Sequence, residues 1–213
     1  MPLTPGLTYR LGRTLYVALT NSCNAVSLIE SRGPGFVMPA ESGFTPLPEG
    51  ITPDAEQIYE AVEAAEGEYD GIAFAGAGEP LLRLSVLEAA AILLQPKGVP
   101  LRLSTNGLVP KSESAVVAQR LRSAGLSSVS VALASADADQ YAQLMRPEKL
   151  RYSPVFSLTV GLAEVTGFVE ACVAEGLAVE CTVVAAPAVD LDAAQSLASA
   201  LGAGFRSRPW FPG

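Results

Sequence analysis

Short apolar runs rich in β-branched residues alternate with longer amphipathic runs along most of the chain. This alternation predicts strands and helices in turn. The expected strands are 14–20, 71–75, 100–105, 128–133, 179–185 and 205–210. The expected helices are 53–65, 84–95, 113–124, 138–145, 165–175 and 192–201. Repeated strand–helix units predict an α/β fold with a parallel sheet covered by helices, either an open sheet or an incomplete barrel.

Local signals mark where several helices begin and end. Thr52 is expected to cap the first helix, and Pro53 suits its first turn. Pro96 is expected to stop the second helix, and Gly125 and Gly176 are expected to close two later ones.

One irregular segment, 21–51, is much longer than the other connections and is rich in Gly, Pro and Ser. A loop of this length at the C-terminal end of a strand is usually functional. With no internal repeat and no low-complexity tract, we expect one core domain over 1–213, with 21–51 as the long loop at its site.

Composition narrows the classes of function. Hydrophobic residues make up 49% and charged residues 17% of the 213 residues, which is typical of a globular chain. The net charge of −8 and the scattered Lys and Arg give no electrostatic reason to bind nucleic acid or an anionic membrane. No apolar run is long enough to span a membrane, and the N-terminus lacks the layout of a secretory signal. A cytoplasmic location is therefore expected.

The chain contains no histidine and only three cysteines. A Ser-His-Asp triad, a histidine general base and histidine-ligated zinc are therefore excluded. Three cysteines are too few and too odd in number for a disulfide framework. Cys172 and Cys181 lie on apolar faces of an expected helix and strand and are expected in the core, whereas Cys23 follows the first strand.

The loop after the second expected strand, AGAGEP, contains Gly76, Gly78, Glu79 and Pro80. Its glycines would let the backbone approach a ligand closely. Glu79 would supply a buried carboxylate at the loop's edge, which suits an ammonium group. The alternative interpretation is a tight turn that leads into a helix.

Two further loops carry polar side chains. Ser104, Thr105 and Asn106 could hydrogen-bond the hydroxyls of a sugar, or could form a turn with Asn106 in the left-handed conformation. Ser135 and Asp137 follow the fourth strand and are expected to cap a helix. The alternative interpretation of Cys23 is that of a small buried hydrophobic residue, which is what an isolated cysteine most often is.

The order of these loops resembles the radical S-adenosylmethionine (SAM) superfamily. The stretches that carry the resemblance are YRLGRTLYVALTNSCN, YDGIAFAGAGEPLLRL, LRLSTNGL, VSVALASADADQYAQLMRP and LGAGFRSRPW, and they look like the subgroup associated with TatD-type hydrolases. The resemblance implies a partial (β/α)6 barrel. It also implies a CxxxCxxC loop for a [4Fe-4S] cluster, a GEP loop that contacts the SAM amino group, and polar residues after the third strand that reach the ribose.

Aligned with CxxxCxxC, the stretch CNAVSLIE places Cys23, Ser27 and Glu30 at the three ligand positions. Arg32 still matches the pattern of the subgroup, so the alignment keeps its frame while two thiolates are missing. Iron–sulfur clusters are held by thiolates, and each lost ligand weakens the site. The resemblance therefore implies a vestigial metal position at Cys23 and argues against a [4Fe-4S] cluster.

Three hypotheses follow. The first is a pseudoenzyme that keeps a pocket for SAM or a related nucleoside and has a binding or regulatory role. The second is an active radical SAM enzyme whose cluster has atypical ligands. The third is an unrelated α/β-barrel enzyme with Glu79 or Asp137 as general base. Whether the chain is an enzyme, and on which substrate, stays open.

The partners expected follow from these hypotheses. A small molecule, SAM or a related nucleoside, is the ligand that the resemblance implies. The last segment, RSRPWFPG, could leave one side of the barrel open, and an exposed apolar edge there would favour a protein partner or a homodimer.

Overall fold

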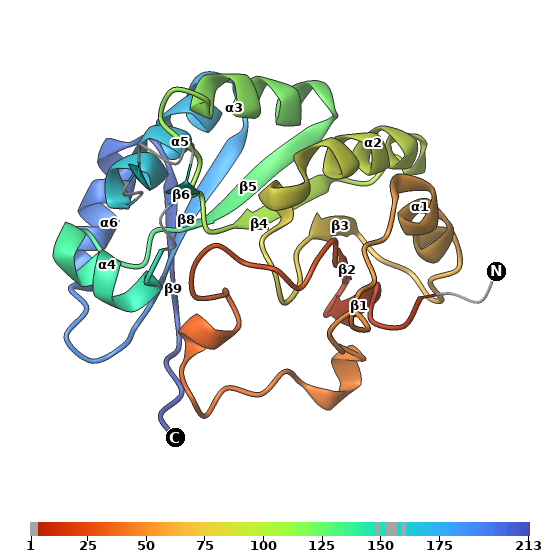
Figure 1. Cartoon of the computed structure of the whole chain (residues 1–213), viewed down its shortest axis with the longest axis horizontal. Helices are drawn as coiled ribbons and strands as arrows, with labels where there is room; N and C mark the ends of the chain where they lie inside the picture. The colour runs from red at the N-terminus through yellow and green to blue at the C-terminus, as the bar shows by residue number, and fades with distance from the viewer. Residues whose placement is uncertain (1–3, 148–149, 152–156, 159–160) are drawn as a thin grey trace.

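The computed structural model in Figure 1 describes residues 4–147, 150–151, 157–158 and 161–213 around a seven-stranded sheet. Its first strand is antiparallel to the second, and all later neighbours run parallel. In spatial order the strands are β1 (Thr8–Leu11), β2 (Thr14–Val17), β3 (Gly71–Phe74), β4 (Leu101–Thr105), β5 (Leu126–Ala132), β8 (Ala178–Val184) and β9 (Gly204–Arg208). The parallel strands β2 to β9 confirm the predicted α/β partial barrel.

The α-helices lie along the outer side of the curved sheet (Figure 1). They match the predicted helices to within three residues and are α1 (Ala55–Glu63), α2 (Leu84–Leu94), α3 (Ser114–Ser123), α4 (Ala138–Met145), α5 (Leu162–Ala174) and α6 (Leu191–Ala200). Short 3-10 turns lie in the connections, at η1 (Glu30–Arg32), η2 (Ala40–Ser42), η3 (Pro80–Arg83) and η4 (Gln95–Lys97).

The sequence did not predict β1 or the short antiparallel pair of β6 (Leu150–Arg151) and β7 (Ser157–Leu158). The hairpin of β1 and β2 turns at Gly12, whose φ of +60° is open to glycine. Four-residue and two-residue strands are too short for a reliable alternation pattern.

The cap of α1 is Asp54, so the prediction of Thr52 is wrong by two positions. The Gln57 amide donates to Asp54 Oδ1 at 2.8 Å, and the Asp54 amide donates to Gln57 Oε1 at 3.0 Å. This reciprocal pair is a capping box, which satisfies two amides where a Thr52 hydroxyl would satisfy one. Gly125 and Gly176 follow α3 and α5 with φ of +89° and +75°, as predicted.

Side chains along each strand alternate between two faces. One face forms the hydrophobic core under the helices, and the other lines the inside of the barrel. One face of each strand packs on the helices, and its buried side chains include Val17, Phe74, Leu103, Val131 and Cys181. Cys172 of α5 is also fully buried, so both cysteines lie in the core as predicted. The other face points into the barrel.

The long loop 21–51 and the C-terminal residues meet across the open side of the barrel. The Phe211 amide donates to the Arg32 carbonyl at 2.9 Å, and the Gly35 amide donates to the Phe211 carbonyl at 3.1 Å. Asn21 holds the two ends of the loop together, because its side-chain amide bonds both the N–H and the C=O of Leu47.

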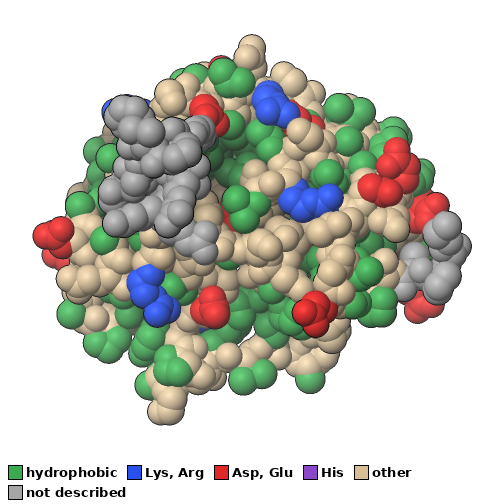
Figure 2. Space-filling model, in the orientation of Figure 1, with side chains coloured by type: hydrophobic (Ala, Val, Ile, Leu, Met, Phe, Trp, Pro, Cys, Tyr) green, Lys and Arg blue, Asp and Glu red, His purple; other side chains and the backbone are tan. Residues whose placement is uncertain are grey.

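The face drawn in Figure 2 shows lysine and arginine side chains singly rather than as a patch. Within the described ranges, no helix combines the length and apolar character that crossing a membrane requires.

Candidate functional site

The inward face of the barrel lines a cavity of about 430 Å³, a volume typical of small-molecule pockets. Its floor comes from alternate strand residues: Tyr16, Ser104, Ser130, Thr182 and Val184. Its remaining wall comes from loop residues between 26 and 38, from the end of α4, from Arg208 at the end of β9, and from Trp210 just after it. Loop 21–51 therefore forms part of a pocket, as its length and position predicted.

Glu79 lies behind this cavity and is only 3% exposed. Its Oε1 accepts hydrogen bonds from the Leu81 amide at 2.9 Å and from the Thr105 hydroxyl at 2.7 Å. Its Oε2 accepts one from the Asn106 amide at 2.8 Å. Burial raises the pKa of the Glu79 carboxyl, and the hydrogen bonds from Asn106, Leu81 and Thr105 oppose that rise. This carboxylate joins the loops after β3 and β4.

The glycines beside Glu79 allow two loops to approach closely. A Cβ at Gly78 would lie 2.3 Å from the Ser22 carbonyl oxygen and 2.6 Å from that of Thr20. A Cβ at Gly76 would lie 2.8 Å from the Cβ of Ala18. Gly76 also lines the cavity, whereas Gly78 does not. The close approach at Gly78 is thus to the loop after β2.

Pro80 is buried and starts η3, with Glu79 as its N-cap residue. This is the tight turn leading into a helix that was the alternative interpretation of AGAGEP. Pro80 itself does not line the cavity.

The three polar residues after β4 have different surroundings. Ser104 is partly exposed and lines the cavity. Thr105 is fully buried, and its hydroxyl donates to Glu79 and accepts from the Gly107 amide at 3.0 Å. Asn106 is 1% exposed, and its side chain bonds Asn24 at 2.7 Å and the Leu108 amide at 3.0 Å. Of the three, Ser104 alone reaches the pocket.

The turn after β4 differs from one prediction. The left-handed residue is Gly107, with φ of +71°, and not Asn106. The reason is steric and polar: Asn106 uses its amide and side chain for the bonds above, and glycine adopts positive φ without penalty.

Cys23 is half-buried beside this group. The Asn106 side-chain amide lies 3.8 Å from its Sγ, within range of a weak hydrogen bond to sulfur. Burial raises the pKa of the Cys23 thiol, and the nearby Glu79 carboxylate adds to that rise. Both effects favour the protonated thiol over the thiolate.

Ser27 and Glu30 bond each other across one turn. The Ser27 amide donates to Glu30 Oε2 at 3.0 Å, and the Glu30 amide approaches the Ser27 hydroxyl at 3.2 Å. The Ser31 amide then donates to the Ser27 carbonyl at 2.9 Å. The sequence S-x-x-E thus forms a reciprocal pair of the capping-box type in the turn that leads into η1, whose own N-cap residue is Ile29. The hydrogen bonds from Ser27 lower the pKa of the Glu30 carboxyl, and the charge of Arg146 lowers it further.

Ser135 and Asp137 lie at a separate, shallower hollow, so the structure does not bring Ser135 together with the other predicted residues. The Ser135 hydroxyl donates to Gln140 Oε1 at 2.7 Å and accepts from the Asp137 amide at 3.0 Å. Asp137 caps α4 by accepting from the Gln140 amide at 2.7 Å, as predicted.

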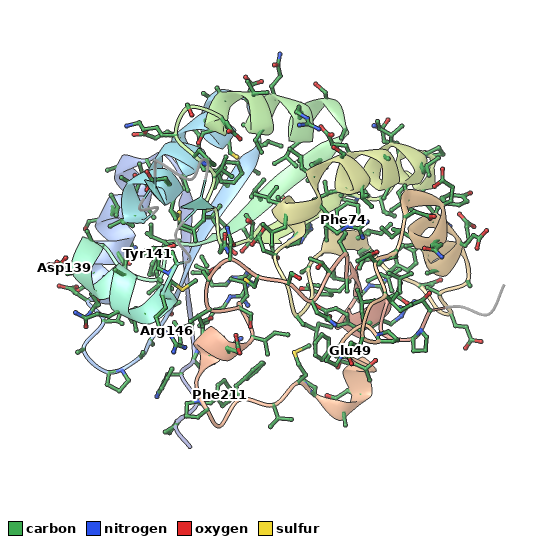
Figure 3. The ribbon with its side chains drawn as sticks, viewed as in Figure 1. Glu49, Phe74, Asp139, Tyr141, Arg146 and Phe211 are labelled. Atoms are coloured by element: carbon green, nitrogen blue, oxygen red, sulfur yellow. The ribbon has the colours of Figure 1, made fainter. Side chains whose placement is uncertain are left out.

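Sequence reasoning missed the arginines and the tryptophan of the pocket wall. Arg146, Arg208 and Trp210 line the cavity. They belong to two of the stretches that carry the family resemblance, but no role in a site was predicted for them. Arg206 and Arg208 are two positions apart on the last strand, so alternation places both on one face but does not say which face it is. Their register partners, Thr182 and Val184, line the cavity, so this face is the inner one. Figure 3 shows Arg146 at the end of α4, on the side nearer to loop 21–51.

Comparison with known proteins gives a family and a fold. The profile of the Radical SAM superfamily matches residues 39–165, which is more than half of the chain. This range begins after Cys23, Ser27 and Glu30. No curated protein in the comparison matches the chain.

Solved structures similar to the chain include SuiB from Streptococcus suis, with a TM-score of 0.64 and 11% sequence identity. That match covers 94% of this chain and 40% of SuiB, so the chain spans about two-fifths of the SuiB length. Another is TsrM from Kitasatospora setae, a radical SAM methyltransferase with cobalamin and a [4Fe-4S] cluster bound. It has 13% identity over 90% of this chain and 36% of TsrM, with a TM-score of 0.48. At these identities the likeness to SuiB concerns the fold.

Proposed function

Because the chain belongs to the radical SAM superfamily, we propose that it is a member without radical chemistry, a pseudoenzyme whose barrel pocket binds a small molecule in a binding or regulatory role. The observation that carries the proposal is the capping box of Ser27 and Glu30, at two of the three positions where the resemblance implies cluster thiolates. SAM or a related nucleoside is the ligand class that the family implies.

The donor set at these positions does not fit a [4Fe-4S] cluster. Such clusters are held by thiolates, and here one thiol is joined by a hydroxyl and a carboxylate. The hydroxyl and the carboxylate are already bonded to each other's backbone amides, and burial disfavours the Cys23 thiolate. Among the residues that the structure describes, no group of three or more Cys, Asp or Glu side chains is placed to hold a metal ion.

The other cysteines give no substitute ligand. Cys172 and Cys181 are fully buried in α5 and β8. Burial raises the pKa of the Cys172 thiol to about 12 and that of Cys181 to about 11. The raised pKa values favour the protonated thiols, and both side chains lie in the hydrophobic core and not in the cavity lining.

The pocket itself supports a binding role. Gly76 and Ser104 present backbone and hydroxyl groups to the cavity, and they belong to the two loops that the resemblance assigns to SAM. Gly78, Glu79, Pro80, Thr105 and Asn106 act behind them and fix the shape of these loops. Glu79 and Asp137 both hold structural hydrogen bonds, so neither is favoured as a general base.

Finer parts of the proposal rest on sequence. The stretches around Gly78, Asn106 and Arg208 support the subgroup associated with TatD-type hydrolases. Composition supports a single core domain over 1–213, located in the cytoplasm, that binds neither nucleic acid nor a membrane.

Anaerobic reconstitution with iron and sulfide tests the proposal. We expect the wild-type protein to hold well under four iron and four labile sulfide ions per chain, the content of one [4Fe-4S] cluster. The Ser27→Cys, Glu30→Cys double variant should take up a full cluster. A Cys23→Ser variant of that double variant is the matched control and should lose the uptake. Full iron and sulfide in the wild type would overturn the proposal.

A further inference from the structure

The charge of the barrel pocket is opposite in sign to the charge of the chain. The whole sequence carries −8, with 22 acidic and 14 basic residues. The charged residues that line the cavity within the described part of the chain are Arg32, Arg146, Arg208 and Glu30. Three cations and one anion leave the pocket with a net charge of +2. Random placement on an acidic protein does not favour such an excess.

Arg208 is the cation of the last strand that lines the cavity. It pairs in register with Val184, which also lines the cavity, so both side chains lie on the inner face. No described residue hydrogen-bonds its guanidinium or forms an ion pair with it, whereas its neighbour Arg206 is paired with Glu180. Burial and the charges of Arg206 and Arg32 lower the pKa of Arg208, and smaller effects of Tyr16 and Glu180 oppose that shift. A partly buried cation without an ion-pair partner of its own is costly, and an anionic ligand would offset that cost.

Arg32 adds a second charge next to Arg208. Its Nε donates to the Pro209 carbonyl at 3.2 Å, and its guanidinium lies 4.6 Å from the ring centre of Phe36 and 5.4 Å from that of Phe211. These contacts hold the guanidinium in place without neutralising it. Figure 3 shows Phe211 beside this loop.

The carboxylate of the pocket is committed elsewhere. Glu30 accepts from the Ser27 amide and feels the charge of Arg146 from the end of α4. Glu30 thus offsets Arg146, and the excess of positive charge remains at Arg32 and Arg208. The rest of the wall is mostly apolar or aromatic and includes Tyr9, Tyr16, Phe36, Met38 and Trp210.

We propose that the pocket binds an organic anion, with its acidic group at Arg208 and Arg32 and its apolar body against the aromatic wall. The inference rests on the proposed function, in that it names the ligand class of the same pocket. Carboxylate and phosphate groups share the chemistry that an arginine pair recognises. SAM carries a net positive charge and is disfavoured here relative to an anionic nucleotide.

Two matched pairs of probes test the charge and the ligand class separately. The first pair is phenylbutyrate and its neutral amide, phenylbutyramide. The second is adenosine monophosphate and adenosine, with SAM as a cationic third member. Binding is measured by calorimetry and by the fluorescence of Trp210, the sole tryptophan of the chain, which lines the pocket. Arg208→Met is compared with Arg122→Met, which removes an exposed arginine of α3 that does not line the cavity.

We expect each acid to bind about tenfold or more tightly than its neutral partner, because hydrogen bonds to charged groups are the stronger ones. Arg208→Met should reduce the ratio of the two affinities to near one, and Arg122→Met should leave that ratio unchanged. Equal affinity of acid and neutral partner, no binding by any probe, or an unchanged ratio in Arg208→Met would each overturn the inference. If phenylbutyrate binds more tightly than its amide but neither nucleotide nor nucleoside binds, the inference of an anion site stands and the nucleoside as ligand class is wrong. Cluster uptake by the wild type would reject the pseudoenzyme alone.

Discussion

Two polar loop regions at the mouth of the barrel differ in how deeply their carboxylates are buried. Around Glu79 the loops after β3 and β4 share a carboxylate that is 3% exposed and whose pKa is raised by burial. Around Glu30 the loop after β2 uses an exposed carboxylate whose pKa is lowered by its hydrogen bonds. Polar residues at the end of a strand can therefore either link two loops through a buried carboxylate or cap a single turn at the surface.

The difference matters for how each loop tolerates change. A buried carboxylate that loses its role leaves several donors without partners, whereas an exposed cap can be exchanged at small cost. This supports the idea that a cluster loop could be rebuilt as a capping box while the loops around Glu79 kept their form.

The largest effect is expected from Glu79→Ala. The change leaves the amides of Leu81 and Asn106 and the hydroxyl of Thr105 without their acceptor in a buried site. A buried donor left without its acceptor costs about 1–3 kcal/mol, and three are left here, so we expect the free energy of unfolding in urea to fall by about 3 kcal/mol or more. Glu170→Ala, on the exposed face of α5, is the control and should change stability by less than about 0.5 kcal/mol. A similar small change for both variants would contradict the deep role of Glu79.

Gly78→Ala tests the contact between the two regions. Its Cβ would overlap the backbone of Thr20 and Ser22, which cannot move as a side chain could. We expect a loss of about 1–3 kcal/mol. Gly204→Ala is the control, because its Cβ would meet the nearest atom at an ordinary 3.6 Å. If the two variants unfold at the same urea concentration, the close packing of these loops is not real.

Ser27→Ala should have a smaller and local effect. Loss of a capping side chain costs about 1 kcal/mol, which corresponds to about fivefold faster hydrogen exchange of the Glu30 amide if exchange occurs by local opening. Ser22→Ala in the same loop should leave that exchange unchanged, since no hydrogen bond of its side chain is found among the described residues. Equal exchange in all three proteins would argue against the capping box.

Glu30→Gln should have the smallest effect on the free energy of unfolding, and that effect should depend on pH. The pKa of Glu30 lies below its ordinary 4.5 in the folded chain. Its contribution to stability is therefore present above pH 4.5 and is lost as the pH falls through the lowered folded value. The difference in unfolding free energy between wild type and Glu30→Gln should be about 0.5 kcal/mol or less at pH 7 and should shrink in acid. If the difference in unfolding free energy between the two proteins grows in acid, the pKa of Glu30 is not lowered by folding.

The sequence predicted the architecture well, because strands such as β3 and β5 are apolar on the face that packs on helices and are followed by periodic helices. It also predicted that Glu79 is buried and that Asp137 caps α4. These features depend on local patterns that a single chain displays.

Features built by contacts between distant segments were harder to predict. Two of the three hydrogen bonds that occupy Glu79 come from residues 26 and 27 positions away, and Gly78 meets a loop more than 50 residues earlier. The pattern S-x-x-E at Ser27 is a local signal of a capping box, whereas the alignment with CxxxCxxC predicts the missing thiolates but not the hydrogen bonds found at these positions. The pocket arginines required the strand register, which single-sequence periodicity does not give.

The most direct measurement is reductive cleavage of SAM by the reconstituted wild-type protein under anaerobic conditions. Dithionite supplies electrons, and chromatography quantifies 5′-deoxyadenosine and methionine. If Ser27 and Glu30 have replaced the cluster thiolates, 5′-deoxyadenosine should not exceed the amount formed without protein. Formation of 5′-deoxyadenosine in proportion to the protein, abolished by Cys23→Ala, would contradict the account and identify an active radical SAM enzyme.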